Sequence, residues 1–281
     1  MLRIAVPNKG SLSEPAVRML SEAGYRERRS AKELVLVDED NDAEFFFLRP
    51  RDIATYVGAG QLEVGITGRD LLLDGNGGAE EVLALGFGRS TFRYAAVPGT
   101  AGSVADFAGK RVATSYTGIV RRDLEQRGVD AEVIHLDGAV ETAVRLGVAD
   151  IVADVVETGA TLREAGLEVL GEPILRSEAV LIRDARIDTN PRIEQLIRRL
   201  HGVIIARQYV MIDYDCRVEV LDDACAITPG IESPTVSPLH DKGWVAVRAM
   251  VEQRATNRVM DELWELGARG ILVTDIMACR L

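Results

Sequence analysis

The sequence predicts an α/β protein that carries a separate small domain at its C-terminus. Short apolar strands alternate with amphipathic helices through most of the first 205 residues, a pattern typical of α/β architectures with mainly parallel sheets. From about Gln208 the order changes to strand, helix, strand, strand, helix, strand, which is the ferredoxin-like arrangement. A length of 281 residues is enough for about two domains of roughly 100–200 residues each.

The expected elements of the first cluster follow from local patterns. A strand at 2–7 leads to a helix that starts at Ser13, an N-cap residue, has Pro15 in its first turn and stops at Gly24. The polar segment "EDNDA" (39–43) separates two apolar strands and predicts a hairpin. The remaining elements of this cluster are a short helix at 51–61 and a strand at 62–68.

A second cluster begins near residue 91 and shows the same alternation. Its expected strands are 92–98, 111–115, 131–136, 150–156 and 178–183, and its expected helices are 118–128, 139–147 and 191–206. Two clusters of this kind predict two lobes with a cleft between them. In the C-terminal domain, Val259, Leu263 and Leu266 share one face of a predicted helix.

Composition narrows the possible partners and compartment. The net charge of −11 argues against binding nucleic acid or an anionic membrane through the overall field, so an anionic substrate needs a local basic cleft. Three cysteines, odd in number and in no C-x-x-C pair, predict neither a disulfide framework nor a zinc site, and indicate a reducing cytoplasm. We expect no signal peptide and no membrane span.

The stretch "ADIVADVVETGATLREAGL" (149–167) reads as a buried strand that breaks into a polar loop and restarts as a helix. A loop entering a helix N-terminus offers unpaired N–H groups and the positive end of the helix dipole to an anion. Gly159 permits close approach, Thr158 and Thr161 add hydroxyls, and Asp154 is suited to sugar hydroxyls. The pattern fits a phosphorylated ribose, and it equally fits an ordinary strand–loop–helix connection with a capping threonine.

A resemblance to a known family favours the first interpretation. The string "GAVETAVRLGVADIVADVVETGATLREAGL" (138–167) is similar to the signature of ATP phosphoribosyltransferase, and "TGATL" resembles the phosphoribosyl-diphosphate loop of phosphoribosyltransferases. Further matches are "RIAVPNKGSL" (3–12), "FFLRPRDI" (46–53), "GITGRD" (65–70), "RVATSY" (111–116) and "TPGIESPTVSPL" (228–239). The ordered set runs from end to end and resembles the long form of that family.

The resemblance implies two catalytic lobes of the type II periplasmic-binding-protein kind and a C-terminal ACT-like regulatory domain. The expected divisions are 1–90 with 173–207 for the first lobe, 91–172 for the second lobe, and 208–281 for the regulatory domain. The implied reaction transfers the phosphoribosyl group of phosphoribosyl diphosphate to N1 of the adenine of ATP and releases diphosphate. It is the first step of histidine biosynthesis, and histidine would inhibit it through the C-terminal domain.

The resemblance also suggests roles for the loop and a cofactor. Asp154 would hold the ribose hydroxyls, and the 5′-phosphate would lie on Glu157, Thr158, Gly159, Ala160, Thr161 and Leu162. The implied cofactor is Mg²⁺, which prefers carboxylates, waters and substrate phosphates to an all-protein cage. The sequence leaves its ligands unknown.

Other candidates lie in loops and at helix starts. Lys9, Arg49 and Arg51 are candidates for the diphosphate or triphosphate, with solvated basic side chains as the alternative. Asp70 reaches a sugar hydroxyl or the metal, or else caps a helix. Glu141 belongs to the signature, or only stabilises a helix dipole. Tyr116 stacks on adenine, or else belongs to the core.

In the C-terminal domain the candidate histidine ligands are Asp215 and Thr235. Asp213 and Asp215 alternate on one strand face, which a solvated strand edge explains equally well. Because such domains pair through their sheets, we expect a homo-oligomer, between a dimer and a hexamer.

Two alternatives remain at this point. Prephenate dehydratase also joins two such lobes to an amino-acid-sensing domain, and "STFRY" (90–94) and "IESPT" (231–235) resemble its motifs. It offers no role for "DVVETGATL". A two-lobed solute binder or ligand sensor is the non-enzyme alternative, but a simple binder needs no phosphoribosyl loop. Diphosphate release from phosphoribosyl diphosphate and ATP separates all three.

Overall fold

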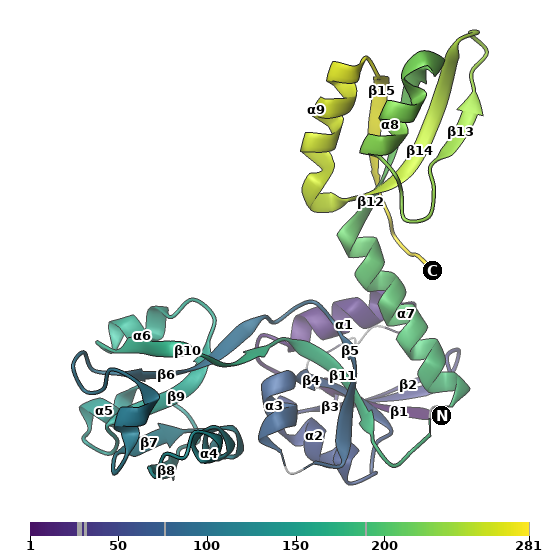
Figure 1. Ribbon diagram of the computed structural model, residues 1–281. Helices are drawn as coiled ribbons and strands as arrows, with labels where there is room; N and C mark the ends of the chain where they lie inside the picture. The colour runs from purple at the N-terminus through teal and green to yellow at the C-terminus, as the bar shows by residue number, and fades with distance from the viewer. Residues whose placement is uncertain (27–29, 31–32, 76, 189, 281) are drawn as a thin grey trace. The chain divides into compact units, whose positions relative to one another are not determined.

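The computed structural model describes residues 1–26, 30, 33–75, 77–188 and 190–280. The described residues form three sheets (Figure 1). They divide into two compact units, one of Met1–Ser21 with Tyr25–Glu194 and one of Glu22–Gly24 with the chain from Gln195 onward. The first unit holds two α/β lobes, which confirms the expected two-lobed architecture.

The first lobe is built on a six-stranded sheet in the order β2-β3-β1-β4-β11-β5. Its strands are β1 (Leu2–Pro7), β2 (Val35–Asp38), β3 (Ala43–Leu48), β4 (Val64–Gly68), β5 (Ala79–Ala84) and β11 (Ala179–Asp184). Its helices are α1 (Ser13–Glu22), α2 (Pro50–Gly58) and α3 (Arg69–Asp74). The predicted β2–β3 hairpin is confirmed, since the two strands pair antiparallel.

The second lobe is built on a five-stranded sheet in the order β10-β6-β9-β7-β8. Its strands are β6 (Ser90–Ala96), β7 (Arg111–Thr114), β8 (Glu132–His135), β9 (Ile151–Val156) and β10 (Glu168–Ser177). Its helices are η1 (Val104–Phe107), α4 (Thr117–Gln126), α5 (Thr142–Arg145) and α6 (Ala160–Glu164). The predicted helix over 139–147 is shorter because Ala139 has a left-handed φ of 49°.

The expectation of mainly parallel sheets is wrong, because both sheets are mixed. In the first lobe β1 pairs parallel with β3 and β4, whereas β11 lies antiparallel between β4 and β5. In the second lobe β6 pairs antiparallel with both β9 and β10. The cause is the chain path: it leaves the first lobe after β5 and returns at Glu178, so β6 and β11 enter their sheets from the opposite end. The return lies beyond the expected position at 173.

The second unit contains a four-stranded antiparallel sheet in the order β13-β14-β12-β15. After α7 (Pro191–Gln208) its elements are β12 (Tyr209–Arg217), η2 (Val218–Val220), α8 (Leu221–Ile227), β13 (Thr235–Pro238), β14 (Trp244–Glu252), η3 (Gln253–Ala255), α9 (Thr256–Leu266) and β15 (Arg269–Asp275). The predicted β-α-β-β-α-β order is confirmed. Val259 and Leu263 are buried in its core, and Leu266 packs against it.

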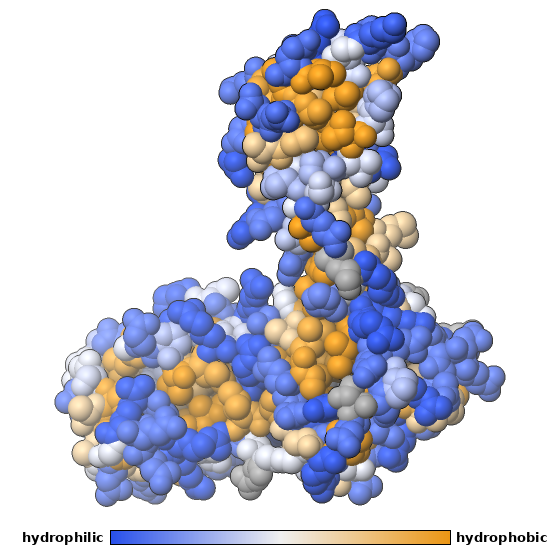
Figure 2. All heavy atoms as spheres, turned by 45° about the vertical axis from the view of Figure 1, so that its right-hand side comes forward, coloured by the Kyte–Doolittle hydropathy of each residue, from blue (hydrophilic) through white to orange (hydrophobic). Residues whose placement is uncertain are grey.

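Hydrophilic residues cover most of the face drawn in Figure 2, and the hydrophobic ones gather in a few patches. The two lobes of the first unit each have their own core. Phe92, Tyr94 and Phe107 are fully buried in the second lobe, and Ile4, Phe45 and Ile53 are fully or almost fully buried in the first. Among the described residues, no helix combines the length and the apolar character that crossing a membrane requires.

Candidate active site

A cavity of about 180 Å³ lies between the two lobes of the first unit. Its walls include four of the residues that the sequence singles out: Lys9, Asp70, Tyr116 and Glu157. They come from the turn after β1, the start of α3, the residue before α4 and the loop after β9. Two of these elements belong to each lobe, so the cavity is completed only by both.

Lys9 is exposed in the turn that follows β1. The turn is closed by the Ser13 hydroxyl, which donates a hydrogen bond of 2.9 Å to the carbonyl of Pro7. Gly10 has a φ of 77° there, a conformation that glycine adopts without steric cost. Strand β1 and helix α1 therefore hold the ammonium-bearing turn at the cavity wall.

Asp70 is buried in the first turn of α3. Its carboxylate accepts a hydrogen bond of 2.8 Å from the Ser177 hydroxyl, and its backbone N–H donates one of 3.0 Å to the same hydroxyl. Gly68 leaves room for this carboxylate, because a Cβ there would lie 2.2 Å from the Asp70 Oδ1. The sequence pattern identified Asp70, but not Ser177, which follows it by 107 residues.

Tyr116 is the residue immediately before α4, and its ring packs at the edge of the second-lobe core. The ring contacts Phe92 in an edge arrangement with centroids 5.1 Å apart, and the Arg51 guanidinium lies 4.7 Å from its centre. Burial, followed by the negative charge of Asp70, raises the pKa of the Tyr116 phenol above its ordinary value. The packing favours the core interpretation of the ring and keeps its hydroxyl neutral.

The two arginines of "RPRD" lie in different surroundings. Arg49 is exposed and directly precedes α2. Arg51, in the first turn of α2, forms an ion pair of 2.9 Å with Asp74 and extends over Tyr116. The Arg51 guanidinium therefore contacts protein groups in this structure, and its ion-pair partner is Asp74 at the end of α3. Asp74 was not among the residues that the sequence suggested.

Asp154 lies on β9 with Glu141 and Asp70 as charged neighbours. Its Oδ1 accepts a hydrogen bond of 2.8 Å from the N–H of Val155. Burial raises the pKa of the Asp154 carboxyl, the charges of Glu141 and Asp70 add to the effect, and the Val155 hydrogen bond opposes it. Glu141 directly precedes the short helix α5. The charges of two other carboxylates thus act on Asp154.

The predicted phosphate loop joins β9 to α6. Gly159 has a φ of 73° and directly precedes α6, which is only 5 residues long. The Thr158 hydroxyl accepts the N–H of Ala160 at 3.4 Å. Thr161 is exposed, whereas Leu162 is buried in the core of the second lobe. Any contact of Leu162 with a ligand would therefore use its backbone.

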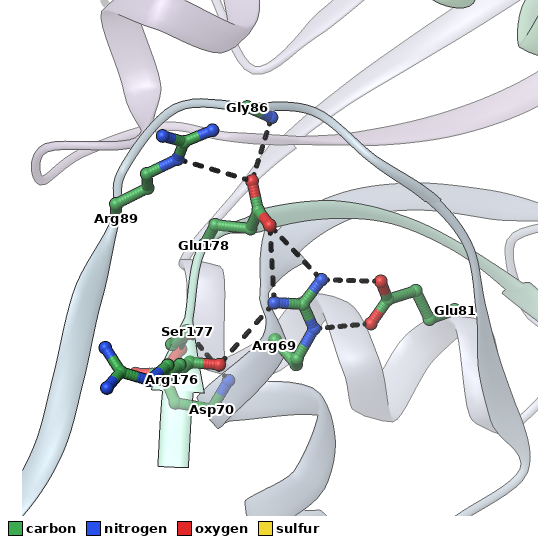
Figure 3. Close-up of polar contacts among 8 residues, drawn as sticks. All are labelled: Arg69, Asp70, Glu81, Gly86, Arg89, Arg176, Ser177 and Glu178. Carbon is green, nitrogen blue, oxygen red and sulfur yellow. Dashed lines mark hydrogen bonds and ion pairs between the residues drawn. The ribbon is translucent and has the colours of Figure 1, made fainter. Parts of the chain in front are cut away.

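A cluster of charged residues joins the first lobe to the two crossings between the lobes (Figure 3). Arg69 donates two hydrogen bonds of 2.7 and 2.8 Å to Glu81, and its guanidinium lies 3.5 Å from Glu178. Glu178, on the returning crossing, also accepts the N–H of Gly86 at 3.1 Å and lies 4.0 Å from Arg89, both on the outgoing crossing. Glu178 therefore ties both crossings together next to Asp70. These partners are far apart in sequence, and no local pattern indicates them.

In the second unit, Asp213 and Asp215 lie on the same face of β12, as predicted. Asp213 forms an ion pair of 2.6 Å with Arg248. The register places Thr235 beside Arg248, and therefore in line with Asp213, whereas Asp215 lines up with Ala246 and Ser237. Thr235 and Asp215 therefore lie on the same face of the sheet, offset by two residues along the strands.

No group of three or more His, Cys, Asp or Glu residues able to hold a metal ion occurs among the residues that the structure describes. The carboxylates at the cavity are spread over several elements, with Asp70 and Glu157 at its walls. Such a donor set fits a hard cation that arrives with substrate phosphates as further ligands. A site made by the protein alone is not visible in the described part of the chain.

Two α/β lobes, linked by two crossings at a cavity and followed by a β-α-β-β-α-β domain, define a two-lobed α/β protein with an added small domain. Residues 49–202 match the family model described as ATP phosphoribosyltransferase, and residues 206–278 match that described as the HisG C-terminal domain. The chain belongs to the ATP phosphoribosyltransferase family. It is an enzyme of the first step of histidine biosynthesis.

Relatives support this over the whole length. The chain is 65% identical over 285 residues to the ATP phosphoribosyltransferase of Streptomyces coelicolor, and 64% identical over 284 residues to that of Pseudarthrobacter chlorophenolicus, with 100% of each chain covered. Among solved structures, the ATP phosphoribosyl transferase (HisG:HisZ) complex from Thermotoga maritima is similar, with a TM-score of 0.64 and 28% identity. That match covers 73% of this chain and 98% of the other.

Proposed function

We propose that the cavity between the lobes is where this chain transfers the phosphoribosyl group to N1 of the adenine of ATP. One observation carries the proposal: Lys9 and Asp70 from the first lobe, and Tyr116 and Glu157 from the second, line the same cavity. A cation, carboxylates and a neutral phenol around one space suit a reaction in which two highly charged substrates must be held together. Sites of this kind commonly lie in the cleft between lobes.

The loop after β9 is proposed to hold the phosphorylated ribose. Glu157 begins the loop at the cavity wall, and Gly159 turns it with a left-handed φ of 73°. The backbone from 157 to 162 would receive the 5′-phosphate, with the hydroxyls of Thr158 and Thr161 as further donors. Asp154, just before the loop, would accept hydrogen bonds from the ribose hydroxyls. Its position near the end of β9, the strand that leads into the loop, supports this role.

The cations are proposed to hold the phosphate chains. Lys9 is exposed at the cavity and presents a compact point charge. Arg49, the residue directly before α2, would contribute a second positive charge. Arg51 would reach a phosphate only by leaving Asp74, so its primary role is to hold the cavity wall against Tyr116. Breaking the bond between C1 and diphosphate develops negative charge on the leaving group, and fixed cations stabilise that charge.

The proposed metal cofactor is Mg²⁺. It would supply charge neutralisation of the diphosphate. The residues that would face it are Asp70, Glu157 and Asp154, a hard oxygen donor set. The raised pKa of Asp154, to which the charges of Glu141 and Asp70 contribute, supports the fit, because a nearby divalent cation offsets the repulsion between carboxylates.

The C-terminal domain is proposed to bind histidine and to inhibit the enzyme. Asp215 would accept the amino or imidazole group, and Thr235 would donate to the carboxylate. We also propose a homo-oligomer between a dimer and a hexamer. An exposed apolar side chain on the face of the sheet that carries Asp213 supports association, since Leu272 is 64% exposed. Three free thiols suit a reducing compartment, which we take to be the cytoplasm.

The test is a diphosphate-release assay with phosphoribosyl diphosphate and ATP in the full chain. Lys9→Ala should lower turnover strongly, because a fixed cation is lost beside the leaving group. The matched control is Lys110→Ala, which removes a lysine of the second lobe outside the cavity and should leave turnover unchanged. Release that requires both substrates and depends on Lys9 supports the proposal. If Lys9→Ala and Lys110→Ala behave alike, the diphosphate does not lie against Lys9.

A further inference from the structure

The carboxylate of Asp74 connects the two lobes at a point away from their crossings. Asp74 is the last residue of α3 in the first lobe. Its Oδ1 accepts hydrogen bonds from the backbone N–H groups of Gly118 at 2.8 Å and Ile119 at 3.2 Å, both in the first turn of α4 in the second lobe. Its Oδ2 accepts a hydrogen bond of 2.9 Å from Arg51. The side chain is only 11% exposed.

Two further contacts bring the end of α3 and the start of α4 together. The Arg122 guanidinium of α4 donates a hydrogen bond to the carbonyl of Leu73. A Cβ at Gly118 would lie 2.3 Å from the Asp74 carbonyl oxygen and 3.1 Å from its Oδ1. Only glycine at this position lets the end of α3 and the start of α4 approach so closely.

The consequence for α4 is that the other lobe caps it. The first N–H groups of a helix have no partner within the helix, and a carboxylate there also interacts favourably with the helix dipole. Because Asp74 belongs to the first lobe, these N–H groups are paired by it only while the lobes touch. If the lobes separated, these N–H groups would hydrogen-bond to water instead of to Asp74. The contact that holds Arg51 to the end of α3 would no longer be supported by the second lobe.

The same contact borders the proposed site. Tyr116, which lines the cavity, is the residue directly before α4, and Arg51 lies over its ring. Asp74 holds both: Arg51 directly, and Tyr116 through the first turn of α4. At the other end of the six-residue helix α3, Asp70 lines the cavity. One short helix therefore carries a cavity residue at its start and the contact with the second lobe at its end.

We propose that Asp74 is a positioning residue for phosphoribosyl transfer. It fixes Tyr116 at the cavity wall by capping α4 from the other lobe and by holding Arg51 over the Tyr116 ring, and it favours the arrangement in which the cavity is complete. Asp74 itself does not touch the substrates. The inference rests on the proposed placement of the reaction in this cavity.

The experiment compares full-length Asp74→Ala and Asp74→Asn with the wild type. The matched control is Asp106→Ala, which removes an aspartate that also accepts two backbone N–H groups, from Gly102 and Ser103 at 2.9 Å each, but within the second lobe. Hydrogen exchange at the amides of Gly118 and Ile119 reports the contact directly. Steady-state kinetics then separate kcat from KM for each substrate.

Asp74→Ala should make both amides exchange faster and should lower kcat/KM at least about tenfold, the loss expected for hydrogen bonds to a charged group. Asp74→Asn retains an oxygen that can accept both N–H groups and loses the charge that holds Arg51. It should therefore keep the amides protected and recover part of the activity. Asp106→Ala should change neither the two amides nor the kinetics.

Wild-type kinetics in Asp74→Ala, or unchanged exchange at Gly118 and Ile119, would overturn the inference. An equal loss of activity in Asp106→Ala would also overturn it, because the effect would then be general destabilisation of the second lobe. If Asp74→Ala does not fold, Asp74→Asn decides, and wild-type kcat/KM in that variant counts against the role. If Asp70→Asn also keeps full turnover, the placement of the reaction is wrong. If the Asp74 variants keep full turnover and Asp70→Asn does not, the reaction lies in this cavity but Asp74 has no positioning role.

Discussion

The hydroxyl of Ser177 donates a hydrogen bond of 2.8 Å to the carboxylate of Asp70 and accepts one of 3.0 Å from the Asp70 backbone N–H. Both residues are buried. Ser177 ends β10 directly before the returning crossing, whereas Asp70 opens α3 at the cavity. The pair therefore links the path of the chain between the lobes to the orientation of a carboxylate at the proposed site.

Removing that hydroxyl should affect both stability and turnover. In Ser177→Ala a buried carboxylate loses a donor, which costs about 1–3 kcal/mol of unfolding free energy. Asp70 should also lose its fixed orientation, so kcat should fall. Urea unfolding and steady-state kinetics measure the two effects. Ser237→Ala, which changes an exposed serine of β13 outside the cavity, is the control. Equal stability and kinetics in both variants would show that Asp70 does not depend on Ser177.

Asp154→Asn should separate stability from activity. Burial, with the charges of Glu141 and Asp70, raises the pKa of Asp154, so the folded chain binds its proton more tightly than the unfolded chain does. The stability linked to that proton is complete below the ordinary carboxyl pKa of about 4 and is lost as pH rises through the higher folded value. At about pH 7 the charge therefore costs stability, and a neutral amide avoids that cost.

The variant should accordingly be at least as stable as the wild type at neutral pH, and this advantage should shrink in acid. Its turnover should fall roughly ten- to hundredfold if the carboxylate holds the ribose hydroxyls. Thermal unfolding at several pH values and the diphosphate assay provide the measurements. Asp150→Asn is the contrasting control, since Arg111 lowers the pKa of Asp150 and its charge is favourable in the fold. A destabilised Asp154→Asn with normal turnover would contradict both parts.

Thr161→Val tests the phosphate loop. Thr161 is exposed, so exchanging its hydroxyl for a methyl group should leave the free energy of unfolding nearly unchanged. If the hydroxyl donates to the 5′-phosphate, the Kd for phosphoribosyl diphosphate should rise roughly ten- to hundredfold. Titration calorimetry with phosphoribosyl diphosphate measures it. Thr274→Val, an exposed threonine of β15, serves as the control. Wild-type affinity in Thr161→Val would remove this residue from the site.

The sequence predicted the local parts of this protein better than the long-range ones. Gly159 and the apolar strand before it mark the loop, and Asp70 stands out in "GITGRD", because each pattern lies within a few residues. Asp74 and Ser177 were missed since their partners are 44 and 107 residues away. Arg51 was a candidate for phosphate binding or a solvated side chain, because nothing local indicates its partner Asp74. The mixed sheets depend on how the chain crosses between the lobes, which strand and helix periodicity does not encode.

Removal of divalent metal should abolish turnover and leave the fold intact. The described residues contain no cluster of His, Cys, Asp or Glu that holds a metal structurally, so unfolding should occur at the same temperature with and without chelator. Adding Mg²⁺ back should restore diphosphate release, because the ion would enter with the substrate phosphates. Zn²⁺, which favours nitrogen and sulfur ligands, serves as a comparison. A lower melting temperature in chelator would reveal a structural metal instead.

The last prediction separates catalysis from control. The C-terminal sheet begins at Tyr209 and buries its own core, which includes Tyr214, Val247 and Leu263. A chain that ends after Arg207 keeps nearly all of α7 and every residue of the cavity. It should still make phosphoribosyl-ATP, at an altered rate, and should no longer respond to histidine.

A point substitution gives the same test without truncation. Asp213 is paired with Arg248, whereas Asp215 forms no ion pair among the described residues. Asp215 is therefore the better candidate to accept a charged ligand group. Asp215→Ala in the full chain should keep turnover and weaken histidine inhibition, and Asp213→Ala should weaken it less. An amino acid bound there acts only through its preference for one global arrangement, typically a coupling of about 1–3 kcal/mol. If the truncated chain were inhibited by the same histidine concentration, histidine would have to bind within the remaining chain.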